Sequence, residues 1–177
     1  MLYIRLTGWK VVGELPANAS RAVIIAAPHT SNWDLPLTLM VSFALNLRIY
    51  WLGKESIFKP PFRGIMMWLG GIAVDRSKSN NLVADSAQAL KDATSPIQLM
   101  IPPEGTRSKA RYWKTGFYYI ALGANVPILL AFMDYEKKEM GLGGAFVPTG
   151  DIDKDMVAIK AFYANVKGKN ADQFDSN

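Results

Sequence analysis

The chain has 177 residues, of which 50% are apolar and 20% charged, and its formal net charge is +5 at pH 7. This length fits one domain, and the apolar fraction is too high for a disordered chain. The chain has no cysteine and one histidine, His29. These counts exclude a disulfide framework, a cysteine nucleophile, and zinc sites built from thiolates or several histidines. We therefore expect no bound metal.

The elements are predicted from short apolar runs, which indicate buried strands, and from helical periodicity between them. In chain order we expect a strand at 21–28, a helix at 32–46, a strand at 47–52, a short helix at 61–69, a strand at 71–75, a helix at 81–93, a strand at 97–101, a helix at 114–123 capped by Gly123, a strand at 126–135, a short edge strand at 143–147 and a helix at 151–166. This alternation predicts an α/β fold, a single domain over residues 1–177 with a mixed, mostly parallel sheet flanked by helices. The tail at 169–177 is expected to be loose.

The positive charge is concentrated in the first two thirds of the chain. Residues 1–120 carry 14 Lys and Arg against 7 Asp and Glu, a net +7, whereas residues 121–177 carry 6 against 8, a net −2. A basic region indicates an acidic partner: nucleic acid, anionic lipid headgroups or a phosphorylated substrate. Because no nucleic-acid-binding motif is present, we expect no nucleic-acid partner.

The first motif is Pro-His-Thr-Ser-Asn-Trp-Asp, directly after the first predicted strand. Its His29 would leave the sheet at the carboxyl end of the strand, where α/β sheets bind ligands. On a straight helix His29 and Asp34 would point about 140° apart. They can meet only if His29 lies in the turn and Asp34 in the first helical turn, with Ser31 and Asp34 forming a capping box. A carboxylate beside the imidazole fixes its tautomer, and the imidazole can then act as a base that removes the proton of a hydroxyl group. The alternative is a helix cap beside a loop histidine.

Two further motifs follow later strands. Residues 102–109 read Pro-Pro-Glu-Gly-Thr-Arg-Ser-Lys. Its glycine, Gly105, lets the backbone pass close to a ligand, the flanking Thr106 and Ser108 can donate hydrogen bonds, and Arg107 can fork onto a phosphate. This turn predicts an anion site. Residues 70–78 place Asp75 and Arg76 after another strand, which alone is typical of an exposed charge pair.

Together and in this order, the motifs resemble those of the glycerolipid acyltransferase family, which includes lysophosphatidic acid and glycerol-3-phosphate acyltransferases. The resemblance spans roughly residues 20 to 135. Its four blocks are residues 29–34, 71–76, 103–108 and 126–128.

The resemblance implies an O-acyltransferase of phospholipid synthesis or remodelling. It would move a fatty acyl group from acyl-CoA or acyl carrier protein to the hydroxyl of a (lyso)glycerophosphate-type lipid, with no cofactor besides the donor. His29 would be the general base, oriented by Asp34 in a His-x4-Asp motif, without a covalent intermediate. The acceptor and its phosphate would be bound by Arg76, Glu104, Gly105, Thr106, Arg107 and Ser108.

Two alternatives stay open. A non-catalytic lipid- or anion-binding module can use the same fold, because fold does not imply activity. A thioester hydrolase can use the same His–Asp pair to activate water.

Membrane signals are limited to possible surface contact. No apolar run reaches the roughly 18 to 20 residues that a spanning helix needs, and the N-terminus is not a convincing signal peptide. We therefore expect a cytoplasmic protein associated peripherally with a membrane. Two groups of apolar residues flanked by cations are typical of a bilayer interface or of ordinary core packing. They are Leu2, Leu6 and Trp9 with Arg5 and Lys10, and Phe58, Phe62, Met66, Met67 and Trp68 with Lys54, Lys59 and Arg63.

Overall fold

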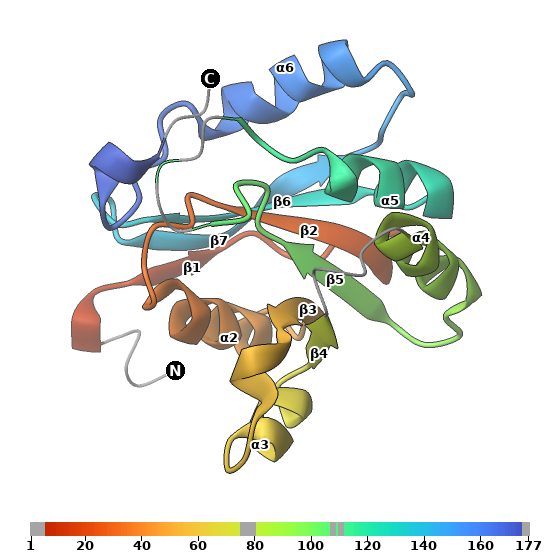
Figure 1. The fold of residues 1–177 in the computed structure, drawn as a ribbon. Coiled ribbons are helices and arrows are strands. Elements are labelled where there is room, and N and C mark those ends of the chain that lie inside the picture. Colours follow the sequence, from red (N-terminus) through yellow and green to blue (C-terminus); the bar gives the residue numbers. More distant parts are fainter. Residues whose placement is uncertain (1–5, 75–80, 107–108, 110–111, 175–177) are drawn as a thin grey trace.

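The computed structural model describes residues 6–74, 81–106, 109 and 112–174. Its strands form one seven-stranded sheet in the order β1-β7-β6-β2-β5-β3-β4 (Figure 1). The strands are β1 (Lys10–Val12), β2 (Arg21–Ala27), β3 (Ile49–Lys54), β4 (Gly71–Val74), β5 (Ile97–Ile101), β6 (Ile128–Asp134) and β7 (Glu139–Phe146). Every neighbouring pair is parallel except the β6–β7 hairpin. The predicted mostly parallel α/β fold is confirmed.

Helices cover both faces of this sheet. They are α2 (Asp34–Ala44), η1 (Glu55–Phe58), α3 (Arg63–Trp68), α4 (Leu82–Asp92), α5 (Gly116–Ala124), α6 (Ile152–Tyr163) and η3 (Ala171–Gln173). In Figure 1, α4, α5 and α6 lie on one side of the sheet, and α2 and α3 on the other.

The central strand β2 shows why the sequence folds this way. Its alternate residues Val23 and Ile25 join the core cluster under α5 and α6, whereas Ile24 and Ala26 join the cluster on the opposite face. All four are buried. A parallel strand with both faces covered is apolar along its whole length, and this explains the run that predicted it.

The strands at the β1 edge of the sheet differ from the prediction. β7 begins at Glu139 instead of residue 143, and it lies between β6 and the unpredicted β1. Glycines in β7 weaken its strand signal. One of them is required by the pairing, because a Cβ at Gly141 would collide with the carbonyl oxygen of Val12. The predicted edge strand is therefore longer and is not an edge.

The predicted cap of the helix at 114–123 was also wrong. α5 runs to Ala124, and Asn125 takes the left-handed conformation, with φ 54° and ψ 49°. Gly123 stays helical and faces α4, where an added Cβ would lie 3.3 Å from that of Ala87. The glycine serves close helix packing, and asparagine tolerates the left-handed cap.

The C-terminal segment makes more contacts than a loose tail would. Lys169 Nζ lies 5.3 Å from the ring centroid of Trp33. Beyond it the chain forms η3, and Phe174 packs against Trp113 with ring centroids 6.3 Å apart. Residues 169–174 are thus held against the body of the protein.

Candidate active site

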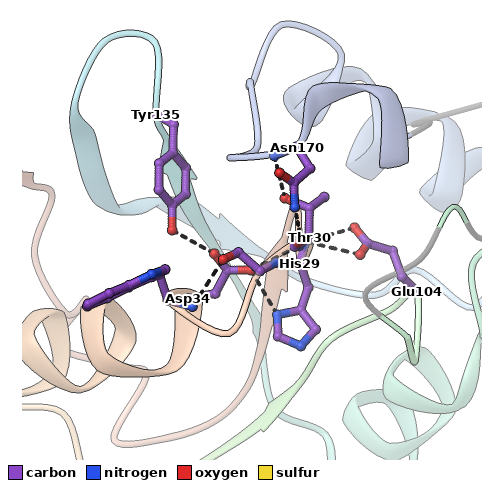
Figure 2. A network of polar contacts seen from close by, with 8 residues as sticks. His29, Thr30, Asp34, Glu104, Tyr135 and Asn170 are labelled. Carbon is purple, nitrogen blue, oxygen red and sulfur yellow. Dashed lines mark hydrogen bonds and ion pairs between the residues drawn. The ribbon is translucent and has the colours of Figure 1, made fainter.

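The candidate site lies where three neighbouring parallel strands end. His29 follows β2, Glu104 follows β5 and Tyr135 follows β6. Because β2 runs parallel to both neighbours, these three residues meet at one edge of the sheet (Figure 2). This carboxyl edge is where α/β sheets commonly bind ligands.

The structure brings His29 and Asp34 together, as their spacing requires. His29 lies in the turn after β2, and Asp34 is the first residue of α2. The Nδ1 atom of His29 is 3.1 Å from Oδ2 of Asp34. The imidazole is partly exposed, with 28% of its side-chain surface accessible, whereas the carboxylate is buried. A carboxylate on Nδ1 favours the tautomer whose proton is on Nδ1, which leaves the Nε2 lone pair available to a substrate.

Backbone and side-chain donors compensate for the burial of Asp34. Its Oδ2 atom also accepts hydrogen bonds from the backbone N–H groups of Thr30 and Ser31, each at 2.9 Å. Its Oδ1 atom accepts a 2.7 Å hydrogen bond from the hydroxyl of Tyr135. A buried carboxylate is tolerated when such donors surround it. The same bonds fix the carboxylate in the position that orients the imidazole.

The predicted capping box forms only in part. The Asp34 carboxylate reaches back to the backbone N–H of Ser31, which is the reciprocal half of the motif. The hydroxyl of Ser31 instead accepts from the N–H of Trp33 at 3.1 Å. Because Asp34 begins α2, Ser31 lies too early in the turn to be the N-cap. The hydrogen bonds in this turn therefore position the Asp34 carboxylate more than they cap α2.

Glu104 holds the backbone of the histidine. Both of its carboxylate oxygens accept from the His29 N–H, at 3.1 and 3.0 Å. Burial raises the pKa of Glu104 from 4.5 to about 7, against the opposing effect of this hydrogen bond. The motif after β5 thus fixes the motif after β2, although 75 residues separate them. This contact points to a positioning role.

The rest of the predicted anion site is described in part. Gly105 has a φ of 66°, and an added Cβ would lie 2.9 Å from Cε and Nζ of Lys114. Glycine is therefore required there, and it brings a cation against the turn. Thr106 is exposed beside it. Arg76, Arg107 and Ser108 lie outside the described residues, so their binding roles stay predictions.

Three residues of this network were not predicted from the sequence. Tyr135 contacts Asp34 across 101 residues of sequence. Asn170 clamps Thr30: its backbone N–H donates to Oγ1 at 3.2 Å, and its amide Nδ2 donates to the carbonyl oxygen at 2.7 Å. Gly168 permits this approach, because a Cβ there would lie 2.8 Å from Thr30 Oγ1. No local pattern marks these residues, since their contacts are all long-range.

The described residues contain neither a metal-binding cluster nor a membrane-spanning helix. No group of three or more His, Asp or Glu side chains is placed to hold a metal ion within the described ranges. Among the helices in those ranges, none has both the length and the apolar character needed to cross a bilayer.

A match to a known family defines the class of protein to which the chain belongs. The profile of the Acyltransferase family matches residues 8–132, which is most of the chain. The chain therefore belongs to this family, and the predicted membership of the glycerolipid acyltransferases is confirmed.

The chain is also similar to individual members of the family and to one solved structure. The chain is 33% identical over 134 residues to the 1-acyl-sn-glycerol-3-phosphate acyltransferase of Haemophilus influenzae, covering 70% of this chain and 53% of that protein. It is 32% identical over 133 residues to the Escherichia coli K12 protein of the same name, covering 70% and 52%. The chain thus spans about half the length of these relatives. The crystal structure of the 1-acyl-sn-glycerophosphate acyltransferase PlsC from Thermotoga maritima shares the fold, with a TM-score of 0.60 and 19% sequence identity. The match covers 89% of this chain and 73% of the PlsC chain.

Proposed function

We propose that this protein transfers a fatty acyl group from a thioester to the free hydroxyl of a 1-acylglycerol-3-phosphate-type lipid, in phospholipid synthesis or remodelling. The observation that carries the proposal is a buried carboxylate on Nδ1 of a partly exposed imidazole, at the carboxyl edge of the sheet. The names of the relatives in Haemophilus influenzae and Escherichia coli support this acceptor.

His29 acts as the general base in this reaction. Its Nε2 removes the proton of the acceptor hydroxyl while the hydroxyl oxygen attacks the thioester carbonyl. A C–O bond forms, the C–S bond breaks, and the departing thiolate takes the proton from the imidazolium. Asp34 stabilises the imidazolium between these steps. No covalent enzyme intermediate is needed, which agrees with a chain without cysteine or a Gly-x-Ser-x-Gly motif.

The acceptor phosphate binds to the basic turn after β5. Arg107, Thr106 and Ser108 provide its donors together with Arg76, which follows β4 in the sequence, because guanidinium groups bind phosphate in a bidentate way. Lys114, whose ammonium lies against Gly105, adds positive charge to the same turn. Glu104 belongs to this motif but keeps the histidine backbone in place.

The donor is acyl-CoA or acyl carrier protein, and the chain works at the cytoplasmic surface of a membrane as a peripheral protein. The net charge of +7 over residues 1–120 supports contact with anionic headgroups. No cofactor besides the donor is required, and residues 1–177 are proposed to act as a single acyltransferase domain.

An acyl-transfer assay with His29→Ala tests the proposal. The variant should lose about 10³-fold in kcat/KM, because general-base catalysis contributes on the order of 10² to 10⁴. Gln88→Ala, an exposed position on α4, is the matched control and should keep its activity. Far-UV circular dichroism and urea unfolding verify that both variants fold.

Three outcomes would contradict the proposal. Full activity in a folded His29→Ala variant would show that His29 is not the general base. Release of free fatty acid at one rate with or without acceptor would identify a thioester hydrolase. Lipid binding without turnover, over a panel of acyl-CoA and acyl carrier protein donors, would identify a binding module.

A further inference from the structure

The segment between β3 and β4 projects from the sheet and carries an unpacked apolar surface. We call residues 55–68, which comprise η1, α3 and the link between them, the α3 knob (Figure 1). No residue of α3 is buried. Four large apolar side chains are mostly exposed, namely Phe62 (60%), Ile65 (55%), Met67 (55%) and Trp68 (78%). The apolar residues of an ordinary short helix in a domain would instead face the core.

The base of the α3 knob is packed against the sheet, and this packing fixes the position of its exposed tip. Phe58 is buried and stacks on Trp51, with ring centroids 5.7 Å apart. Its ring lies so close to Gly53 and Gly71 that a Cβ at either position would come within 2.8 Å of it. The indole N–H of Trp51 donates to the carbonyl oxygen of Leu69 at 3.0 Å. The tip is therefore held out on a fixed support.

Charge around the tip favours an anionic partner. Lys54, Lys59 and Arg63 are exposed, and Glu55 is the single acid between residues 54 and 68. Within the part of the chain that the structure describes, none of these three cations forms an ion pair. Aromatic and aliphatic side chains bordered by cations match the interface of an anionic bilayer, with its apolar boundary beneath negative headgroups.

A second copy of the chain fits this surface less well. In a two-fold contact the same patch meets itself, which would bring the cations of one copy close to those of the other. Like charges brought together in this way disfavour association. A lipid surface supplies both the apolar layer and the opposite charge.

We propose that the α3 knob inserts Phe62, Ile65, Met67 and Trp68 into the headgroup boundary of an anionic lipid bilayer. The inference rests on the proposed function, because it assigns the surface through which the enzyme reaches a membrane-resident acceptor. The geometry is suited to this role. η1 begins where β3 ends, and β3 runs in the same direction as β2, so the knob starts at the edge of the sheet that carries His29.

Vesicle co-sedimentation tests the surface. The unaltered chain should bind phosphatidylglycerol-containing vesicles more tightly than phosphatidylcholine vesicles. The double variant Phe62→Ser/Trp68→Ser should bind at least about tenfold more weakly, since it removes two large apolar side chains from the interface. The control Val147→Ser/Val157→Ser removes two side chains that are equally exposed, at 68% and 70%, away from α3. It should bind within about twofold of the unaltered chain.

The absence of cysteine allows a second, site-specific measurement. Nothing lies within 4 Å of a Cβ built on Gly64, so Gly64→Cys can carry a polarity-sensitive fluorophore without repacking. Its emission should shift to the blue on phosphatidylglycerol vesicles. The same label on Val157→Cys, in α6 on the opposite face of the sheet, should not shift.

The outcomes separate this inference from the proposed reaction. Equal vesicle binding by Phe62→Ser/Trp68→Ser and its control, or no blue shift at position 64, overturns the inference. So does a dimer in light scattering that only the knob variant converts to a monomer, and so does failure of the unaltered chain to bind vesicles. Turnover of a dispersed short-chain acceptor tests the reaction separately, and Phe62→Ser/Trp68→Ser should keep that activity.

Discussion

The turn around His29 and the α3 knob follow two strands of the same sheet but are held in opposite ways. The turn, residues 28–34, is fixed by Glu104 after β5, by Tyr135 after β6 and by Asn170 from the C-terminal segment. The α3 knob is anchored through Phe58 at its base, and α3 itself buries no side chain.

The difference fits the role proposed for each segment. A base and its orienting carboxylate need positions fixed within a fraction of an ångström, which requires supporting contacts from several elements. A surface that enters a bilayer needs exposed apolar area and nearby cations. Substitutions in the turn should therefore be costly, and substitutions at the tip of the knob should be nearly neutral for folding.

Among the residues that hold His29 in place, Asp34 should show the largest loss of activity, and a loss of stability, when it is replaced by asparagine (Asp34→Asn). The amide oxygen can take the place of Oδ2, but it is neutral and accepts more weakly from the backbone N–H groups, and the NH2 group replaces the Oδ1 that accepts from Tyr135. The protein should lose about 1–3 kcal/mol of unfolding free energy. Its kcat should fall at least about 10²-fold, because the base loses its partner. Urea unfolding and steady-state kinetics measure both effects, and unchanged kcat would contradict the role of the pair.

Glu104→Gln should change the pH dependence of stability. Because burial raises the folded pKa of Glu104 from 4.5 to about 7, the native state binds the proton more tightly than the unfolded chain. This contribution to stability is present below pH 4.5 and is lost as the pH rises through 7. By linkage it amounts to roughly 3 kcal/mol.

Glutamine keeps an acceptor for the His29 N–H and does not ionise. The stability of Glu104→Gln relative to the unaltered chain should therefore rise between pH 4.5 and 8, in urea titrations at several pH values. Parallel stability profiles for the two proteins would show that this carboxyl does not titrate in that range.

Tyr135→Phe should have a smaller effect. It removes the 2.7 Å hydrogen bond to Oδ1 of Asp34 but leaves the three contacts to Oδ2. We expect a loss of about 1 kcal/mol in stability and up to about tenfold in kcat. The acceptor KM should not change, because the tyrosine acts through Asp34. Tyr119→Phe, at an exposed position of α5, is the control, and a KM effect without a kcat effect would contradict this role.

Gly64→Ala should have the smallest effect, and a favourable one. The glycine is inside α3, and an added Cβ meets nothing within 4 Å. Alanine should stabilise the helix by about 0.5–1 kcal/mol. Gly141→Ala is the contrast, since its Cβ would collide with the Val12 carbonyl and should destabilise the protein. Marked destabilisation by Gly64→Ala would show that the knob is packed after all.

Local patterns were sufficient for the framework of the sheet. The apolar runs at 21–28 and 97–101 predicted β2 and β5 because central parallel strands are buried on both faces. The pattern was insufficient at the β1–β7 edge, where glycines and a three-residue strand leave little periodicity to read. The cap of α5 was wrong because the choice between Gly123 and Asn125 depends on the packing of α4.

For the candidate site, the sequence by itself identified the pair proposed to be catalytic, since His29 is the sole histidine and Asp34 lies within the same turn. Their meeting depends on contacts between nearby residues, which a motif can encode. The tertiary structure decided what holds that pair: contacts to Glu104, Tyr135 and Asn170 join residues 75, 101 and 140 positions apart. It also decided which apolar residues stay outside the core. Phe58 and Trp68 belong to one apolar cluster in the sequence, but only the fold buries the first and exposes the second.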